Sequence, residues 1–184
     1  MLRTRMWVSL TLSAFTLFSL VSTLYAQVTV RQQLFVMKEI VPNVKKVGIL
    51  WNTSAGESNF IEKLKRAAAP MGVEIYVVEV TSLKDVSKGF KDLADGYGVK
   101  AIWVATSDEI LNNPSSRKYL IKNATLKQIP LFSPNSEWIG DGACVYVGKA
   151  EGKIKLWVNE KTAKVVQLQI PEKYKETAEL LAKN

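Results

Sequence analysis

The sequence predicts an α/β fold in three layers, with helices covering both faces of a mainly parallel sheet. Short apolar runs rich in β-branched residues alternate along the chain with segments of helical periodicity. Three consecutive units have the order strand, polar loop and helix, which is typical of parallel strands joined by helical crossovers. Because no repeat, low-complexity tract or long linker interrupts this order, we expect one domain.

The apolar runs predict five strands in the mainly parallel sheet and one added strand nearer the C-terminus. The run from Val47 to Trp51 is the clearest, since it stops abruptly at small polar residues that lead into a helical segment. Residues 73–80 are rich in Val and Ile, which favour strands. The expected strands are 46–51, 73–80, 100–105, 129–132, 143–147 and 154–158.

Amphipathic spacing and end signals predict the helices. Ser54 lies three residues before Glu57, so the pair has the spacing of a capping box at a helix start. Asn113 precedes Pro114, which is a favoured first helical residue. Helices are expected at 27–43, 54–70, 82–96, 113–126 and 162–166, and the charged, Ala- and Leu-rich residues 172–184 predict a final helix.

Residues 1–26 have the composition of a secretory signal peptide. Two arginines give a positive start, an apolar run from Trp7 to Val21 follows, and Leu24-Tyr25-Ala26 ends in a small residue. We therefore expect cleavage there and a periplasmic protein consisting of residues 27–184. An uncleaved N-terminal membrane anchor is the alternative, since the apolar run approaches the length that spans a bilayer.

The composition excludes several kinds of chemistry. The chain has no His and a single Cys, which excludes Ser-His-Asp and Cys-His catalysis, His-ligated zinc and thiolate metal clusters. Cys144 lies in an apolar run, where a buried and inert thiol is expected. Neither a phosphate-binding loop nor a dinucleotide fingerprint follows a strand, so we expect no cofactor. A hydrolase using Asp108 would lack a base and a nucleophile, and we expect no enzyme.

The formal net charge of +8 raises the question of a nucleic-acid or anionic-lipid partner. The lysines are scattered along the helices and the tail rather than clustered, and exported proteins meet little nucleic acid. Solvated helix faces therefore explain the charge, and no nucleic-acid partner is expected.

Polar loops follow three of the predicted strands and should meet at one edge of the sheet. Ligands of open α/β sheets bind beyond the carboxyl ends of the strands. Hydroxyl, amide and carboxylate groups at such an edge, beside a helix N-terminus, suit an anion or a small polar solute. The expected ligand-binding residues are Asn52, Thr53, Ser54, Thr106, Asp108, Ser133, Asn135 and Trp138.

Local structure offers a competing explanation for some of these residues. Ser54 is better explained as a helix cap, because Glu57 completes its capping box. Asn52 and Asp108 are less explained by local structure, and both interpretations stay open for them. Aromatic walls often stack on a ligand, although burial is the commoner fate of such residues; Trp138 is the best candidate for stacking.

Several stretches match one known protein family in order and spacing. Met37 to Asn52 reads MKEIVPNVKKVGILWN, close to a family pattern in which Leu-x-Pro-Asn-x-Lys-x-Val-Gly-Val-Leu-Tyr-Asn follows a helix. Further matches are 68–80, 101–108, 129–132, 140–147 and 159–171. On these stretches the chain resembles the ABC-transporter substrate-binding proteins, in the group that includes tryptophan- and tyrosine-type solute receptors.

The resemblance implies two Rossmann-like lobes that close around a ligand, of which this chain would supply one. The predicted signal peptide runs almost directly into the family's second lobe, and a long helix expected after residue 147 is missing. We therefore expect residues 27–184 to form a single periplasmic-binding-protein-like lobe. The resemblance implies that one half of the family's ligand cleft is formed here by Asn52, Ser54, Thr106, Asp108 and Asn135. Half a cleft encloses less of a ligand than a full cleft does.

Two functions of different classes follow from the resemblance. The first is an exported component of an ABC transporter system that binds a small polar solute, such as an amino acid, and serves a permease. The alternative is a truncated, non-transport interaction module that forms a homodimer or docks on a membrane sensor or permease. Neither function requires a metal or another cofactor.

Overall fold

The computed structural model describes residues 28–181. The predicted signal peptide, residues 1–26, lies outside the described residues. Within 28–181 the structure contains no helix that is both long enough and apolar enough to cross a bilayer.

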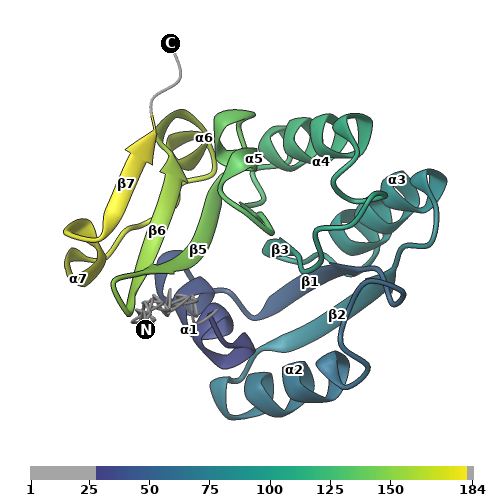
Figure 1. The fold of residues 1–184 in the computed structure, drawn as a ribbon, viewed down its shortest axis with the longest axis horizontal. Coiled ribbons are helices and arrows are strands. Elements are labelled where there is room, and N and C mark those ends of the chain that lie inside the picture. The colour runs from purple at the N-terminus through teal and green to yellow at the C-terminus, as the bar shows by residue number, and fades with distance from the viewer. Residues whose placement is uncertain (1–27, 182–184) are drawn as a thin grey trace, which may run out of the picture.

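A seven-stranded sheet runs through the centre of the molecule in the order β2-β1-β3-β4-β5-β6-β7 (Figure 1). The strands β1 to β5 are parallel to one another, β6 is antiparallel to β5, and β7 is parallel to β6. This confirms the predicted α/β class with a mainly parallel sheet. The strands are β1 Lys46–Trp51, β2 Glu74–Glu79, β3 Ala101–Val104, β4 Leu131–Phe132, β5 Val145–Ala150, β6 Lys153–Asn159 and β7 Ala178–Leu181.

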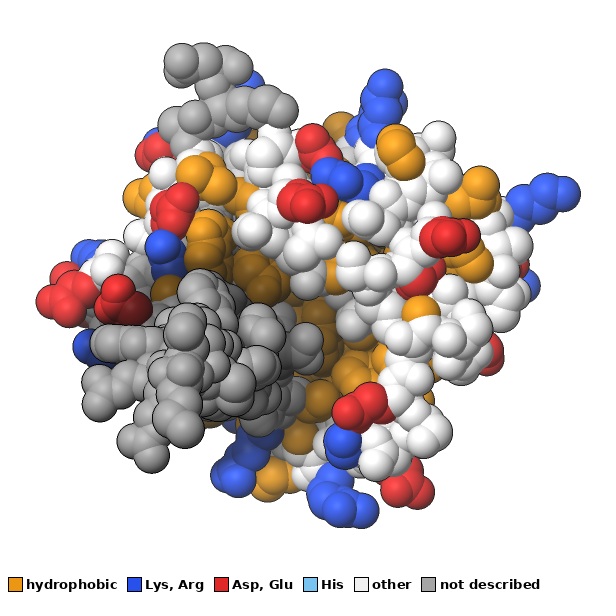
Figure 2. Space-filling view, viewed as in Figure 1, with side chains coloured by type: hydrophobic (Ala, Val, Ile, Leu, Met, Phe, Trp, Pro, Cys, Tyr) orange, Lys and Arg blue, Asp and Glu red, His pale blue; other side chains and the backbone are white. Residues whose placement is uncertain are grey.

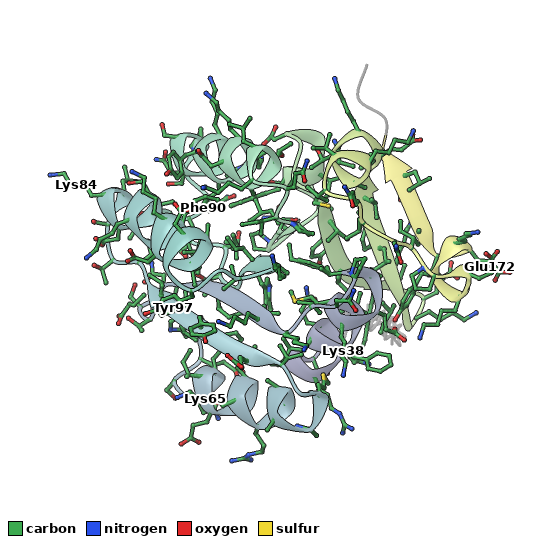
Figure 3. All side chains as sticks on the ribbon, turned by 180° about the vertical axis from the view of Figure 1, so that it is seen from behind. Lys38, Lys65, Lys84, Phe90, Tyr97 and Glu172 are labelled. Carbon is green, nitrogen blue, oxygen red and sulfur yellow. The ribbon has the colours of Figure 1, made fainter. Side chains whose placement is uncertain are left out.

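Helices cover both faces of the sheet (Figure 1). The helices α1 and α2 pack on one face, while α3 and α4 pack on the other, where Phe90 meets Tyr119 at a centroid distance of 6.0 Å (Figure 3). The helices are α1 Val30–Ile40, α2 Phe60–Ala68, α3 Leu83–Lys91, α4 Pro114–Leu126, α5 Glu137–Gly140, α6 Glu160–Val165 and α7 Glu172–Lys175, with a 3-10 turn Ala69–Met71 and a π-helical turn Asp92–Gly96.

Strand β1 separates two hydrophobic cores. Ile49 belongs to the core under α1 and α2, while its neighbour Leu50 belongs to the core under α3 and α4, and both are fully buried. Successive side chains of a strand point to opposite faces, so an uninterrupted apolar run fills both cores at once. This is why the run from Val47 to Trp51 predicts a central strand.

The predicted capping box at the start of the second helix is wrong. Helix α2 begins at Phe60, and the Ser54 hydroxyl instead donates to the Asn52 side-chain oxygen at 2.7 Å. Glu57 forms an ion pair with Lys63 at 2.6 Å. The Ser54 N–H also donates to Asn52, so an Asx turn extends the loop and delays the helix.

The predicted C-terminal helix is also wrong in its second half. Helix α7 ends at Lys175, and Ala178–Leu181 forms strand β7 against β6. The open edge of β6 carries unpaired backbone groups, and pairing them outweighs the helix preference of Ala, Glu and Leu, which so short a segment cannot express by itself. A Lys155–Glu179 ion pair at 2.8 Å links the two strands.

Cys144 provides a direct test of the packing beneath β5. Its side chain is fully buried, and burial raises the pKa of the thiol to about 12. We expect no reaction with an alkylating reagent at mildly alkaline pH in native protein, and complete reaction in concentrated guanidinium chloride, measured by intact mass. Rapid labelling of the native protein would show that this face of the sheet opens readily.

Candidate functional site

The loops after β1 and β3 meet at the carboxyl edge of the sheet and are joined by hydrogen bonds. The Asn52 N–H donates to the Thr106 hydroxyl at 3.3 Å, and that hydroxyl donates to a carboxylate oxygen of Asp108 at 2.8 Å. Asn52 and Thr106 are both buried. We call the polar residues of this edge the rim; it is formed by Asn52, Thr53, Ser54, Thr106, Ser107, Asp108, Ser133 and Asn135.

The loop after β4 joins the same edge. The Asn135 side-chain amide donates to the Ser107 hydroxyl at 3.2 Å, which connects this loop to the one after β3. The buried Ser133 hydroxyl donates to the Asn135 backbone oxygen at 2.9 Å and holds the loop in shape. Three loops from neighbouring parallel strands therefore share one edge, as their sequence positions predict.

The side chains of the rim differ in their hydrogen bonds within the protein and in their exposure to solvent. Thr53 donates its hydroxyl to Glu79 at the end of β2, so it is turned toward the neighbouring strand. Thr53, Ser54 and Ser107 are exposed. Their hydroxyl groups are the rim groups that solvent reaches most freely.

Asp108 is the ionisable group at the centre of the rim. Burial raises the pKa of its carboxyl, but hydrogen bonds from Asn52, from the Leu111 N–H, from Thr106 and from the Ile110 N–H outweigh burial and lower it below its ordinary value. The group is therefore a carboxylate at neutral pH. A negative charge held in place by fixed donors can attract the ammonium group of a solute.

Trp138 does not line the rim. Its side chain is fully buried, its indole N–H donates to Asn112 at 2.8 Å, and the Arg117 guanidinium lies 5.5 Å from its ring. An apolar ring with a satisfied donor is stable in the core, which explains the difference from the expected ligand-stacking role. Trp51 and Trp103, not Trp138, line the nearest open space.

That open space is a groove between α1 and α2, which we call the α1–α2 groove. It has a volume of about 880 Å³. Trp51 stacks on Phe60 at 4.3 Å, and Trp103 meets Phe60 edge-on at 5.6 Å. Figure 2 shows this face hollowed at its centre, with hydrophobic side chains at the bottom of the hollow and basic side chains along its lower border, where α2 runs.

Three basic side chains line the α1–α2 groove: Arg31 from α1, and Lys63 and Arg66 from α2. Sequence reasoning missed them, because residues 31 and 66 come from separate helices and each has the pattern of a solvated helix position. The one sequence feature that points to them is their position on α1 and α2, beside the apolar stripes that face the core. In the described part of the chain, no group of three or more acidic, Cys or His side chains is placed to hold a metal ion.

The lowered pKa of Asp108 has a consequence for stability. A carboxyl whose folded-state pKa is depressed stabilises the fold above its ordinary value of 3.8 and loses that contribution as pH falls further. We expect Asp108→Asn to lower the free energy of unfolding at neutral pH, with a difference that shrinks below that value, measured by urea denaturation. Glu109→Gln, at the exposed neighbouring carboxylate, is the control and should change little at any pH. A deficit that is constant with pH would contradict this account.

Gly56 is required by the aromatic end of the groove. A Cβ built on Gly56 overlaps the indole ring of Trp51, whereas one built on Gly96 meets no atom within 4 Å. We expect Gly56→Ala to cost about 1–3 kcal/mol, as overpacking does, and to shift tryptophan emission as Trp51 leaves its stack. Gly96→Ala is the matched control; equal stability of the two variants would contradict the packing described here.

Comparison with known proteins finds one matching family model and several solved structures of similar fold. A family model described as ABC transporter substrate binding protein matches residues 18–175. A conserved domain protein from Vibrio cholerae is 24% identical, with a TM-score of 0.67, over 82% of this chain and 59% of that chain. An ABC domain in complex with L-Trp from Streptococcus pneumoniae is 20% identical, with a TM-score of 0.68, over 83% and 60% respectively. No curated protein matches.

A third solved structure is the ligand-free, open form of a substrate binding protein with adhesive properties from Clostridium difficile. It is 21% identical, with a TM-score of 0.67, over 85% of this chain and 61% of that chain. The chain thus spans about three fifths of the length of these structures, and at such identities they show a shared fold. Because the family model covers most of the sequence, the chain belongs to the family of ABC transporter substrate-binding proteins.

Proposed function

We propose that the protein is an exported, non-enzymatic component of an ABC transporter system that binds a small polar solute at the rim. The single observation that carries the proposal is the convergence of three polar loops on one sheet edge, where Asn52 bonds to Thr106 and Asn135 bonds to Ser107. Family membership supports the solute-binding role. The predicted signal peptide supports export to the periplasm.

The chemistry of the rim favours a solute that carries an ammonium group. Asp108 supplies a carboxylate, and the exposed hydroxyls of Ser54 and Ser107 supply groups that donate or accept hydrogen bonds. An amino acid would place its ammonium group at Asp108 and its carboxylate at the hydroxyls of Ser54 and Ser107. The L-Trp bound by the Streptococcus pneumoniae relative makes amino acids the first solutes to test.

Residues 27–184 would act as one lobe in this proposal. A rim open on one side encloses a small solute less completely than a closed cleft, and affinity follows enclosure. We therefore expect weak binding by the isolated chain and stronger binding where a facing surface covers the rim.

A second candidate function is the interaction module, in which that facing surface is a protein. The observation favouring it is that Thr53, Ser54 and Ser107 of the rim are exposed, so the rim presents polar groups that a protein surface could contact. A second copy of the chain, a permease or a membrane sensor would then cover the rim. Sedimentation of the purified protein separates the two: a strict monomer that binds solute supports the first function, and a dimer that binds none supports the second.

The test of the rim is isothermal titration with L-amino acids. Hydrogen bonds to charged groups contribute about 1.5–3 kcal/mol, so we expect Asp108→Ala to weaken binding by roughly 10- to 150-fold. Asn52→Ala should weaken it by a smaller factor, because its N–H bond to Thr106 remains. Glu109→Ala, at the adjacent exposed carboxylate, should leave the affinity unchanged. Absence of heat with every amino acid, or equal effects of Asp108→Ala and Glu109→Ala, would contradict the proposal.

A further inference from the structure

The α1–α2 groove is a separate concave space that the rim does not account for. It shares Thr106 and Ser107 with the rim but extends away from the sheet edge, between Val28–Arg31 on one side and α2 on the other. Its volume of about 880 Å³ lies within the roughly 300–1,000 Å³ that small-molecule sites occupy.

The bottom of the groove is apolar and only partly covered. Apolar side chains that line the groove are each half-buried rather than sealed in the core: Val28, Val30, Ala67, Trp103 and Ala105. The stacked rings of Trp51 and Phe60, which are mostly buried, also line the groove. An apolar chain or ring that displaces water from such a surface lowers the free energy, so its binding is favourable.

The charges around this apolar bottom are mostly positive. Arg31, Lys63 and Arg66 line the groove with one carboxylate, Glu57, which forms an ion pair with Lys63. Within residues 28–181, neither arginine takes part in an ion pair. Arg31 also lies in the first turn of α1, which contains no acidic residue although a helix start favours one.

From this arrangement we infer that the α1–α2 groove binds an amphipathic organic carboxylate. The apolar chain or ring of the ligand lies along Trp103 and Ala105, and its carboxylate meets the guanidinium groups of Arg31 and Arg66. Guanidinium groups match carboxylates in geometry and form bidentate hydrogen bonds with them. A neutral ligand would leave this charge unused, and a fully polar solute would leave the apolar bottom exposed.

This ligand class goes beyond the proposed function, since the groove can be filled while the rim is empty. The rim offers a carboxylate to a cation, whereas the groove offers cations to a carboxylate. A ligand that carries a carboxylate and an apolar chain but no ammonium group therefore reports on the groove and not on the rim.

The test uses decanoate and decan-1-ol, which share an apolar chain and differ in charge. Binding to the purified protein is followed by titration calorimetry and by the emission of the tryptophans, two of which line the groove. We expect decanoate to bind and decanol to bind at least 10-fold more weakly. Equal affinity for both, or no binding of decanoate, would overturn the inference.

The arginines are tested with the double variant Arg31→Gln/Arg66→Gln. It should bind decanoate and decanol alike, while its circular dichroism stays that of the parent. Lys65→Gln is the matched control, because Lys65 lies on α2 but does not line the groove (Figure 3). Retained preference for decanoate in the double variant, or an equal loss in Lys65→Gln, would overturn the role of the arginines.

A groove-filling variant and a rim variant separate this inference from the proposed function. Ala67→Leu places a larger apolar side chain in the groove and should weaken decanoate binding without adding or removing charge. Asp108→Ala should leave decanoate binding unchanged while it weakens amino-acid binding by roughly 10- to 150-fold. Loss of decanoate binding in Asp108→Ala would overturn the claim of a separate site, and amino-acid binding without decanoate binding would leave the proposed function standing alone.

Discussion

The parallel register of β1, β3 and β4 is the constraint on which the rest of the molecule depends. Ile49 pairs with Trp103, and Trp103 pairs with Phe132, so the three strands point the same way and end at the same edge. Their loops then come within hydrogen-bonding distance without any special loop geometry. A slip of one residue would exchange the two cores and turn Trp103 away from the groove. The rim and the groove are consequences of one alignment.

Much of this alignment could be predicted from the sequence. The run 46–51 becomes β1 with the same bounds, because a strand buried on both faces leaves a continuous apolar signal. The convergence of the polar loops follows from parallel strands alone. The two errors have different causes. Ser54 bonds to Asn52 in a local Asx turn instead of capping α2, so one local interaction replaces another. Ala178–Leu181 joins the open edge of β6 instead of extending a helix, so a tertiary contact outweighs local preference there. The capping box that does form, at Thr29 and Gln32, begins α1.

The site was harder to predict than the fold, for a physical reason. Trp51, Trp103 and Trp138 all lie in or shortly after predicted strands, yet of these three only Trp51 and Trp103 line the groove. Which aromatic ring is covered depends on the packing of elements far apart in the chain. Trp138 belongs to α5 and is buried in the core under α3 and α4, where its indole N–H donates to Asn112. Arg31 and Arg66 could not be singled out by their positions beside the apolar stripes of their helices, since an exposed cation on a helix has the same local pattern whether it faces a groove or bulk water.

The rim and the groove differ in how completely their polar groups are already satisfied. Asn52, Thr106 and Asp108 bond to one another, so a solute at the rim must exchange some of these bonds for its own and gains little net free energy per contact. The guanidinium groups of Arg31 and Arg66 form no ion pair with residues 28–181, and the apolar bottom between them stays partly uncovered. A ligand there adds contacts without breaking protein ones. The groove should therefore bind its ligand in the isolated chain. The affinity of the rim should rise most when a facing surface removes water from Asp108 and its solute.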